Sequence, residues 1–197
     1  MGVLIGPNTL YYVIVRPKGK LREDFDFSDE KVRKPALLRP EMGERGTGDM
    51  ATTVIAITNQ KGGVGKTTTA AALLTGLHRR GAAVLGVDMD PQGSLGFSLG
   101  LDIEHCTTIY DVFRGQAEPE QAIVRTDTCD ILPSNILLSG AELEFNRPGR
   151  EFLLKTALSK VEDQYDYIII DTPPALSLLT VNAYVATDSL IIPMSPE

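Results

Sequence analysis

Several features of large protein classes are missing from this sequence. No apolar run in the 197 residues reaches the roughly 18–20 residues that cross a bilayer. The N-terminus has no basic start followed by an unbroken apolar stretch, because Gly6, Pro7 and Asn8 interrupt it, so no secretory signal is expected. With ordinary hydrophobic and charged fractions of 43% and 23%, and no internal repeats, the composition predicts about one globular domain.

Cysteine is scarce, and its spacing excludes two common uses. Cys106 and Cys129 do not form a C-x-x-C pair, so we expect neither a disulfide nor a structural zinc, and a reduced cytoplasmic setting. Iron–sulfur ligation is a third possible use of these cysteines. The Gly-rich surroundings typical of such ligands are absent, which favours two ordinary thiols.

Basic residues are outnumbered, 19 against 26 acidic ones, giving a net charge of −7. Such a chain has no overall attraction for nucleic acid, and DNA binding would need a local basic patch. The scattered arginines at positions 114, 125, 147 and 150 form no contiguous run, so no such patch is assigned.

The composition divides the chain near residue 50. Residues 1–49 carry mixed charge, Pro35, Pro40 and a Gly-rich run at 43–48, which is typical of an extension, a disordered arm or a linker. Within it, residues 9–15 are a candidate strand. One hypothesis is that Met50 is the natural start. We expect residues 50–197 to form the folded domain.

From residue 50 onward, candidate strands and helices alternate. The pattern predicts strands at 53–58, 83–87, 130–132, 167–170 and 189–192, and helices at 67–80, 118–124, 151–162 and 176–186. Alternation of this kind is typical of an α/β fold, a doubly wound parallel sheet with helices on both faces.

The turn between the first of these strands and its helix is rich in glycine and resembles a P-loop. Glycines let successive backbone N–H groups point at phosphate oxygens, and the helix N-terminus adds positive charge there. Lys66 can reach the β- and γ-phosphates, and the Thr67 hydroxyl can ligate Mg²⁺. Gln60 stands where the usual motif has glycine, and a Gly-rich turn without a ligand is the alternative. The expected nucleotide-binding residues are Lys61, Gly62, Gly63, Val64, Gly65, Lys66, Thr67 and Thr68.

Two aspartates follow other predicted strands and meet the same edge of a parallel sheet. Asp90 comes after the strand at 83–87, and Asp171 ends the strand at 167–170. Carboxylates placed there can hold Mg²⁺ and orient an attacking water. Helix capping is the alternative for either residue alone. Asp88 is a weaker candidate, because one of two closely spaced aspartates often satisfies loop N–H groups instead.

These motifs together resemble one family. The loop from Lys61 to Thr69 resembles the deviant Walker A of the ParA/MinD ATPases, and Asp90-Pro91-Gln92-Gly93 resembles the ParA branch in particular. The segments at 131–142 and 165–174 are also similar to ParA proteins. The resemblance runs from about residue 53 to residue 197 and leaves residues 1–49 outside.

The resemblance implies a role for each matching residue. Lys61 matches the signature lysine that reaches the partner's ATP phosphates in a dimer, and Lys66 the P-loop lysine. Thr67 matches the Mg²⁺ ligand, Asp90 the aspartate that positions the hydrolytic water, and Asp171 the Walker B aspartate near Mg²⁺. The implied catalytic set is Lys61, Lys66, Asp90 and Asp171, and the implied metal set is Thr67, Asp90 and Asp171.

The family also implies cofactors and partners. ATP and Mg²⁺ are expected, with an ATP-bound homodimer that coats DNA non-specifically and a ParB-like activator of hydrolysis. This cycle partitions plasmids or chromosomes and places the protein on the nucleoid in the cytoplasm. No membrane partner is expected.

The sequence departs from the family at its C-terminus, where it ends at Glu197. Family members continue through further strands, an adenine-contacting loop and basic DNA-contacting residues. We therefore interpret the chain as a fragment with the C-terminal strands missing and expect an unpaired sheet edge. The alternatives left open are a MinD-like membrane-cycling ATPase, which would need a C-terminal amphipathic helix, and an inactive truncated remnant.

Overall fold

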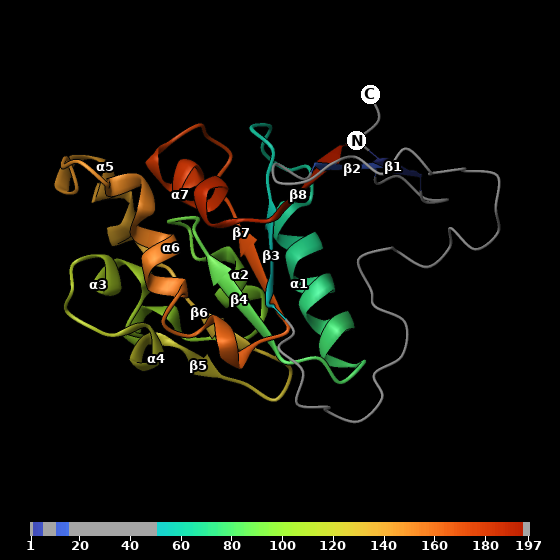
Figure 1. Cartoon of the computed structure of the whole chain (residues 1–197), viewed down its shortest axis with the longest axis horizontal. Helices are drawn as coiled ribbons and strands as arrows, with labels where there is room; N and C mark the ends of the chain where they lie inside the picture. The colour runs from blue at the N-terminus through green and yellow to red at the C-terminus, as the bar shows by residue number, and fades with distance from the viewer. Residues whose placement is uncertain (1, 6–10, 16–50, 195–197) are drawn as a thin grey trace.

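The computed structural model describes residues 2–5, 11–15 and 51–194 (Figure 1). A central sheet carries helices on both of its faces, as the alternating pattern predicts. The mixed-charge and Gly-rich stretches predicted between residues 16 and 50 lie outside the described residues. Within those residues, no helix has both the length and the apolar character needed to cross a membrane.

The sheet that the described residues form has the strand order β1-β2-β8-β3-β7-β4-β6-β5. The neighbours β8, β3, β7, β4 and β6 are parallel, while β5 at one edge and the β1–β2 hairpin at the other pair antiparallel. The strands are β1 (Gly2–Ile5), β2 (Tyr11–Val15), β3 (Thr53–Ile57), β4 (Val84–Asp88), β5 (Val124–Arg125), β6 (Asp130–Leu132), β7 (Tyr167–Asp171) and β8 (Ser189–Met194).

The edge expected to be unpaired is occupied. Strand β2 pairs antiparallel with β8, with Tyr11 opposite Met194 and Val15 opposite Leu190. The expectation of an open edge beside the last strand is therefore wrong, because backbone groups of β8 find partners within the same chain. Residues 11–15 of the strand expected at 9–15 are extended, and β1 was not predicted.

Helices divide between the two faces of the sheet. Helices α1 and α2 pack on one face, and α3 to α7 cover the other. The helices are α1 (Lys66–His78), α2 (Ser94–Ser98), α3 (Ile109–Phe113), α4 (Pro119–Ala122), α5 (Ala141–Glu144), α6 (Leu153–Leu158) and α7 (Leu178–Ala186), with 3-10 turns η2 (Ile103–His105), η3 (Ile136–Gly140), η4 (Arg150–Phe152) and η5 (Glu162–Gln164).

The central strands are apolar along their whole length because both of their faces are buried. In β3, Ile55 and Ile57 pack toward α1, while Val54 and Ala56 face the opposite helices. This two-sided burial fixes the register of β3 between β7 and β8, and with it the position of the Gly-rich turn that follows β3.

Two predicted helices are shorter than expected. The helix expected at 151–162 is helical in α6 only at Leu153–Leu158, because the chain turns after it to bury Val161 and Tyr165 in the core. The helix expected at 118–124 ends at Ala122 in α4. The next residues form β5, where Val124 pairs with Ile131 of β6.

Valine at position 86 should destabilise the fold without touching the candidate site. A Cβ on Gly86 would lie 2.6 Å from Ile131 Cδ1 and 2.7 Å from Leu74 Cδ1, so β4 has no room for a side chain beneath α1. We expect Gly86→Val to cost about 1–3 kcal/mol, read as a lower denaturation midpoint with an unchanged m-value. Gly76→Ala, in α1 with open space at its Cβ, is the control; an equal loss in both variants would contradict this account.

Candidate functional site

The Gly-rich turn connects β3 to the first residue of α1. Gly63 and Gly65 have φ angles of 71° and 83°, a left-handed backbone that side-chain-bearing residues rarely adopt. Gly65 is the N-cap of α1, and among the described residues no side chain caps this helix end. The first N–H groups of α1 therefore remain available to an anion.

Lys66 opens α1 and is only 7% exposed. Its Nζ donates to the carbonyl of Lys61 at 3.3 Å. Burial lowers the pKa of the Lys66 ammonium, while the charges of Asp171 and Asp90 act in the opposite direction. A buried cation next to two carboxylates, at the start of a helix, is suited to phosphate binding.

Asp171, the last residue of β7, is fully buried. Neither of its carboxylate oxygens makes a hydrogen bond of ordinary length in the described structure, and the Thr67 side chain is the one donor that acts on its pKa. Burial raises the pKa of Asp171 to about 7, and the charges of Asp88 and Asp90 add to the rise, while Thr67 and Lys66 lower it. Buried carboxylates are normally paired or metal-bound, so two unpartnered oxygens fit a hard cation such as Mg²⁺.

Asp88 has a different role from its neighbour in β7. It is buried, and its carboxylate accepts hydrogen bonds from the N–H groups of Asp90 at 3.0 Å, Leu95 at 2.9 Å and Gly96 at 3.4 Å. Burial raises the pKa of Asp88 to about 6. It thus holds the loop before α2 and the first turn of that helix, which agrees with the structural alternative given for Asp88 from the sequence.

Asp90 lies in that loop and is half-buried. Its Oδ1 accepts from the Gln92 N–H at 3.0 Å, and its charge acts on both Lys66 and Asp171. The structure thus brings Lys66, Asp90 and Asp171 together at the carboxyl ends of β3, β4 and β7, where ligands of parallel sheets bind.

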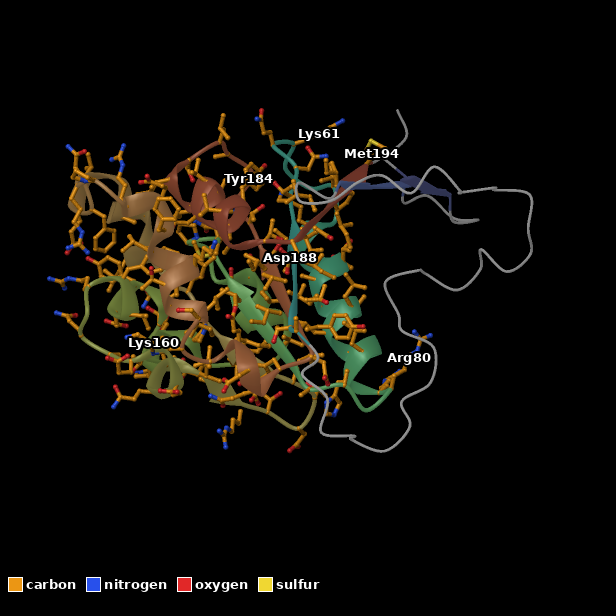
Figure 2. The ribbon with its side chains drawn as sticks, in the orientation of Figure 1. Lys61, Arg80, Lys160, Tyr184, Asp188 and Met194 are labelled. Carbon is orange, nitrogen blue, oxygen red and sulfur yellow. The ribbon has the colours of Figure 1, made fainter. Side chains whose placement is uncertain are left out.

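The other predicted nucleotide-binding residues differ in how exposed they are. Val64 is buried under the turn, whereas Lys61 and Thr68 are exposed. Figure 2 shows Lys61 at the far end of the turn above β3. Among the described residues there is no group of three His, Cys, Asp or Glu that could hold a metal. An Mg²⁺ ion held by Thr67, Asp90 and Asp171 would need additional oxygens from phosphate or water.

The sequence matches a known protein family. The family model described as AAA domain (AAA_31) matches residues 52–197. The chain belongs to this family. Its sequence is 48% identical over 150 residues to the sporulation initiation inhibitor protein Soj of Bacillus subtilis, an alignment that covers 73% of this chain and 58% of Soj. The resemblance to ParA/MinD ATPases is confirmed.

Solved structures of proteins similar to this chain share its fold. A plasmid partition protein from Borrelia burgdorferi aligns with a TM-score of 0.66 at 34% identity, covering 74% of this chain and 67% of that one. A cobyrinic acid a,c-diamide synthase from Mycobacterium smegmatis, solved with an ATP analog and magnesium, aligns with a TM-score of 0.68 at 48% identity, covering 70% and 56%. The expected P-loop α/β fold is therefore confirmed.

Two polar residues that the sequence analysis did not single out hold the ends of strands and loops next to the candidate site. The Thr172 hydroxyl donates to the Ile57 carbonyl at 2.9 Å and ties the end of β7 to the end of β3. The Ser134 hydroxyl donates to the Asp90 carbonyl. Both lie inside sequence segments that resemble ParA proteins, and that resemblance is the signal that could have identified them.

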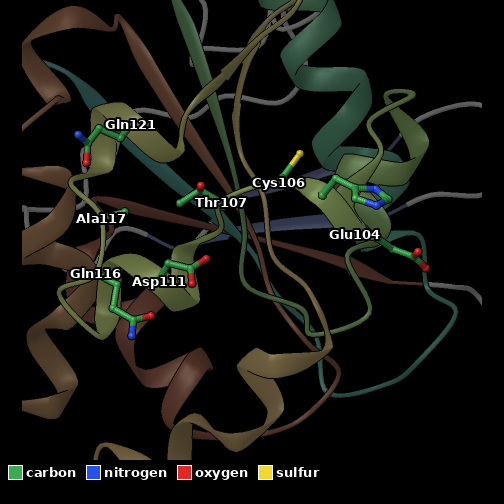
Figure 3. Close-up of a pocket in the computed structure, with 8 residues that line it drawn as sticks. Glu104, Cys106, Thr107, Asp111, Gln116, Ala117 and Gln121 are labelled. Atoms are coloured by element: carbon green, nitrogen blue, oxygen red, sulfur yellow. The ribbon is translucent and has the colours of Figure 1, made fainter.

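A pocket of about 530 Å³ lies away from the P-loop, beside η2 and α3 (Figure 3). Cys106 lines it, and its thiol donates to the Asp102 carbonyl at 3.1 Å. Burial and the Asp102 charge raise the pKa of Cys106, so this thiol stays protonated at neutral pH. None of the predicted site residues lines this pocket.

Proposed function

We propose that this chain is the nucleotide-binding part of a ParA-type partition ATPase. It binds ATP with Mg²⁺, hydrolyses it to ADP and phosphate, and uses the two nucleotide states to switch between dimer and monomer. The observation that carries this proposal is the unpartnered, buried Asp171 carboxylate close to the Lys66 ammonium below the Gly-rich turn. The similarity to Soj and to the plasmid partition protein supports it.

Each residue has a defined task in this proposal. The N–H groups of the turn and the Lys66 ammonium hold the terminal phosphates. Thr67, Asp90 and Asp171 hold Mg²⁺, which when bound neutralises phosphate charge and fixes the orientation of the phosphoryl group. Asp90, the more exposed of the two carboxylates, positions the attacking water.

In this proposal, Lys61 makes a contact between the two subunits of the dimer. Its side chain is exposed at the end of the turn, whereas Lys66 is buried at the start of α1. In the proposed dimer, Lys61 reaches the phosphates bound by the partner. ATP then favours the dimer because only the triphosphate supplies this contact, and hydrolysis removes it.

The remaining partners are proposed for the whole protein, of which this chain covers only part. They are a ParB-like activator and non-specific DNA on the nucleoid, in the cytoplasm. The mycobacterial synthase and the partition proteins are both similar to this chain in fold.

Alanine at position 61 should separate dimerisation from nucleotide binding. Lys61→Ala removes the proposed contact to the partner and leaves Lys66 and the turn in place. We expect loss of the ATP-dependent dimer in sedimentation velocity, with monomer affinity for a fluorescent ATP analogue changed less than about 3-fold.

The control for this experiment is the wild type with ADP, which should remain monomeric. Loss of both dimerisation and nucleotide binding, or of neither, would contradict the role of Lys61. ATP turnover is measured in parallel with and without DNA. A wild-type turnover equal to that of Lys66→Ala would instead identify an inactive remnant.

A further inference from the structure

Asn59 bridges two parts of the molecule at the start of the turn. Its Nδ2 donates to the carbonyl of Pro193 in β8 at 2.7 Å, and its Oδ1 accepts from the Lys61 N–H at 2.9 Å. The first bond spans 134 residues of sequence, so this is more than a local turn. Figure 2 shows Lys61 at the top of the turn, above Tyr184 of α7 and Met194 at the end of β8 in this view.

The residue before Asn59 is held from the other side. The Thr58 hydroxyl shares a hydrogen bond of 2.8 Å with the Tyr184 hydroxyl, and the Thr58 N–H donates to the Ile191 carbonyl at 3.0 Å. The chain therefore leaves β3 fixed to both α7 and β8 at Thr58, and to β8 again at Asn59. Only beyond Asn59 does it become exposed, at Gln60 and Lys61.

The main chain of Lys61 is held at both of its polar atoms. Asn59 Oδ1 binds its N–H, and the Lys66 ammonium binds its carbonyl at the longer distance of 3.3 Å. Lys66 is also the group proposed to hold phosphate. If the ammonium turns to phosphate, its bond to the Lys61 carbonyl weakens, and the bond from Asn59 remains.

We propose that Asn59 is the positioning residue for Lys61. It fixes the Lys61 main chain against β8, so that the exposed ammonium is presented in one direction to a second copy of this chain. Asn59 itself contacts no phosphate in this proposal. The inference rests on the proposed dimerisation function. It makes the neutral Asn59 side chain responsible for part of the geometry that dimerisation needs.

The test compares Asn59→Ala with a matched variant, Asn135→Ala. Asn135 makes the same kind of local hydrogen bond at the start of η3, where its Oδ1 accepts from the Leu137 N–H at 3.1 Å. Asn59→Asp is the second variant, because it keeps an acceptor for the Lys61 N–H but loses the donor to Pro193. The full chain is used, and thermal unfolding followed by circular dichroism shows that each variant folds.

Three measurements are made. We expect Asn59→Ala to raise amide hydrogen exchange at Lys61 in the nucleotide-free protein by about 10-fold, since a protecting hydrogen bond is lost. The protein concentration needed for half-dimerisation with ATP and Mg²⁺ should rise by about 10-fold. The monomer's affinity for a fluorescent ATP analogue should change by less than about 3-fold. Asn59→Asp should fall between wild type and alanine, and Asn135→Ala should match wild type.

Unchanged exchange at Lys61 in Asn59→Ala would overturn the proposal, and so would an equal loss of dimer in Asn135→Ala. The exchange measurement needs no dimer and no nucleotide. If the wild type fails to dimerise with ATP, the proposed function is wrong, while the exchange result still decides whether Asn59 holds Lys61.

Discussion

Alanine at position 66 should weaken ATP binding by at least about 100-fold. The Lys66 ammonium is buried next to Asp171 and Asp90, so its loss removes the positive charge offered to the phosphates and leaves two carboxylates facing them. Isothermal titration calorimetry with ATP and Mg²⁺ measures the affinity, and turnover should fall to background.

Lys160→Ala is the matched control for this prediction. Lys160 is exposed, lies at the lower left in Figure 2, well away from Lys61 in this view, and forms an ion pair of 2.6 Å with Glu118. Removing an exposed pair of this kind changes stability little and should leave ATP affinity unchanged. ATP binding retained in Lys66→Ala would contradict the nucleotide site itself.

Asparagine at position 171 should have opposite effects on stability and on metal-dependent binding. Asp171 is fully buried, and its pKa rises from 3.8 to about 7 on folding. A rise of that size corresponds to destabilisation on the order of 4 kcal/mol above pH 7, which asparagine removes in part. We expect the nucleotide-free Tm to rise by a few degrees, while the Mg²⁺-dependent gain in ATP affinity falls by at least about 100-fold.

The pH dependence of unfolding tests whether the charge on Asp171 causes this stability difference. Between pH 4 and pH 7, the folded protein keeps a proton on Asp171 that the unfolded chain has lost, so wild-type stability falls as the pH rises. The stability difference between variant and wild type should therefore be small at pH 4 and largest above pH 7. The exposed Asp163→Asn serves as control, and a pH-independent difference would contradict the assignment. Calorimetry with ATP, with Mg²⁺ and then with EDTA, measures the metal-dependent part.

The central strands were predictable because each is a short apolar, β-branched run that both faces of the sheet bury. β3, β4 and β7 lie within one residue of their predicted bounds. The turn and α1 were predictable for a related reason. Glycines, a lysine and a threonine at these spacings have a single common use between a strand and a helix.

Other parts of the structure depend on contacts that the sequence does not display. Helices α2, α3 and α5 have only four or five residues, too short for an apolar period, and tertiary packing forms them. Asp88 and Asp171 look alike in sequence as polar ends of buried strands. Only their surroundings distinguish them. Asp88 accepts hydrogen bonds from three backbone N–H groups, whereas Asp171 accepts none from the backbone in the described structure.

The unequal burial of the two cysteines has a practical consequence. Cys129 is 4% exposed, whereas Cys106 is partly accessible in the pocket beside η2. A maleimide dye should therefore attach at one position only, and slowly at neutral pH, because burial raises the Cys106 pKa. Mixing donor- and acceptor-labelled protein would then report subunit exchange in real time by energy transfer, with no engineered thiol.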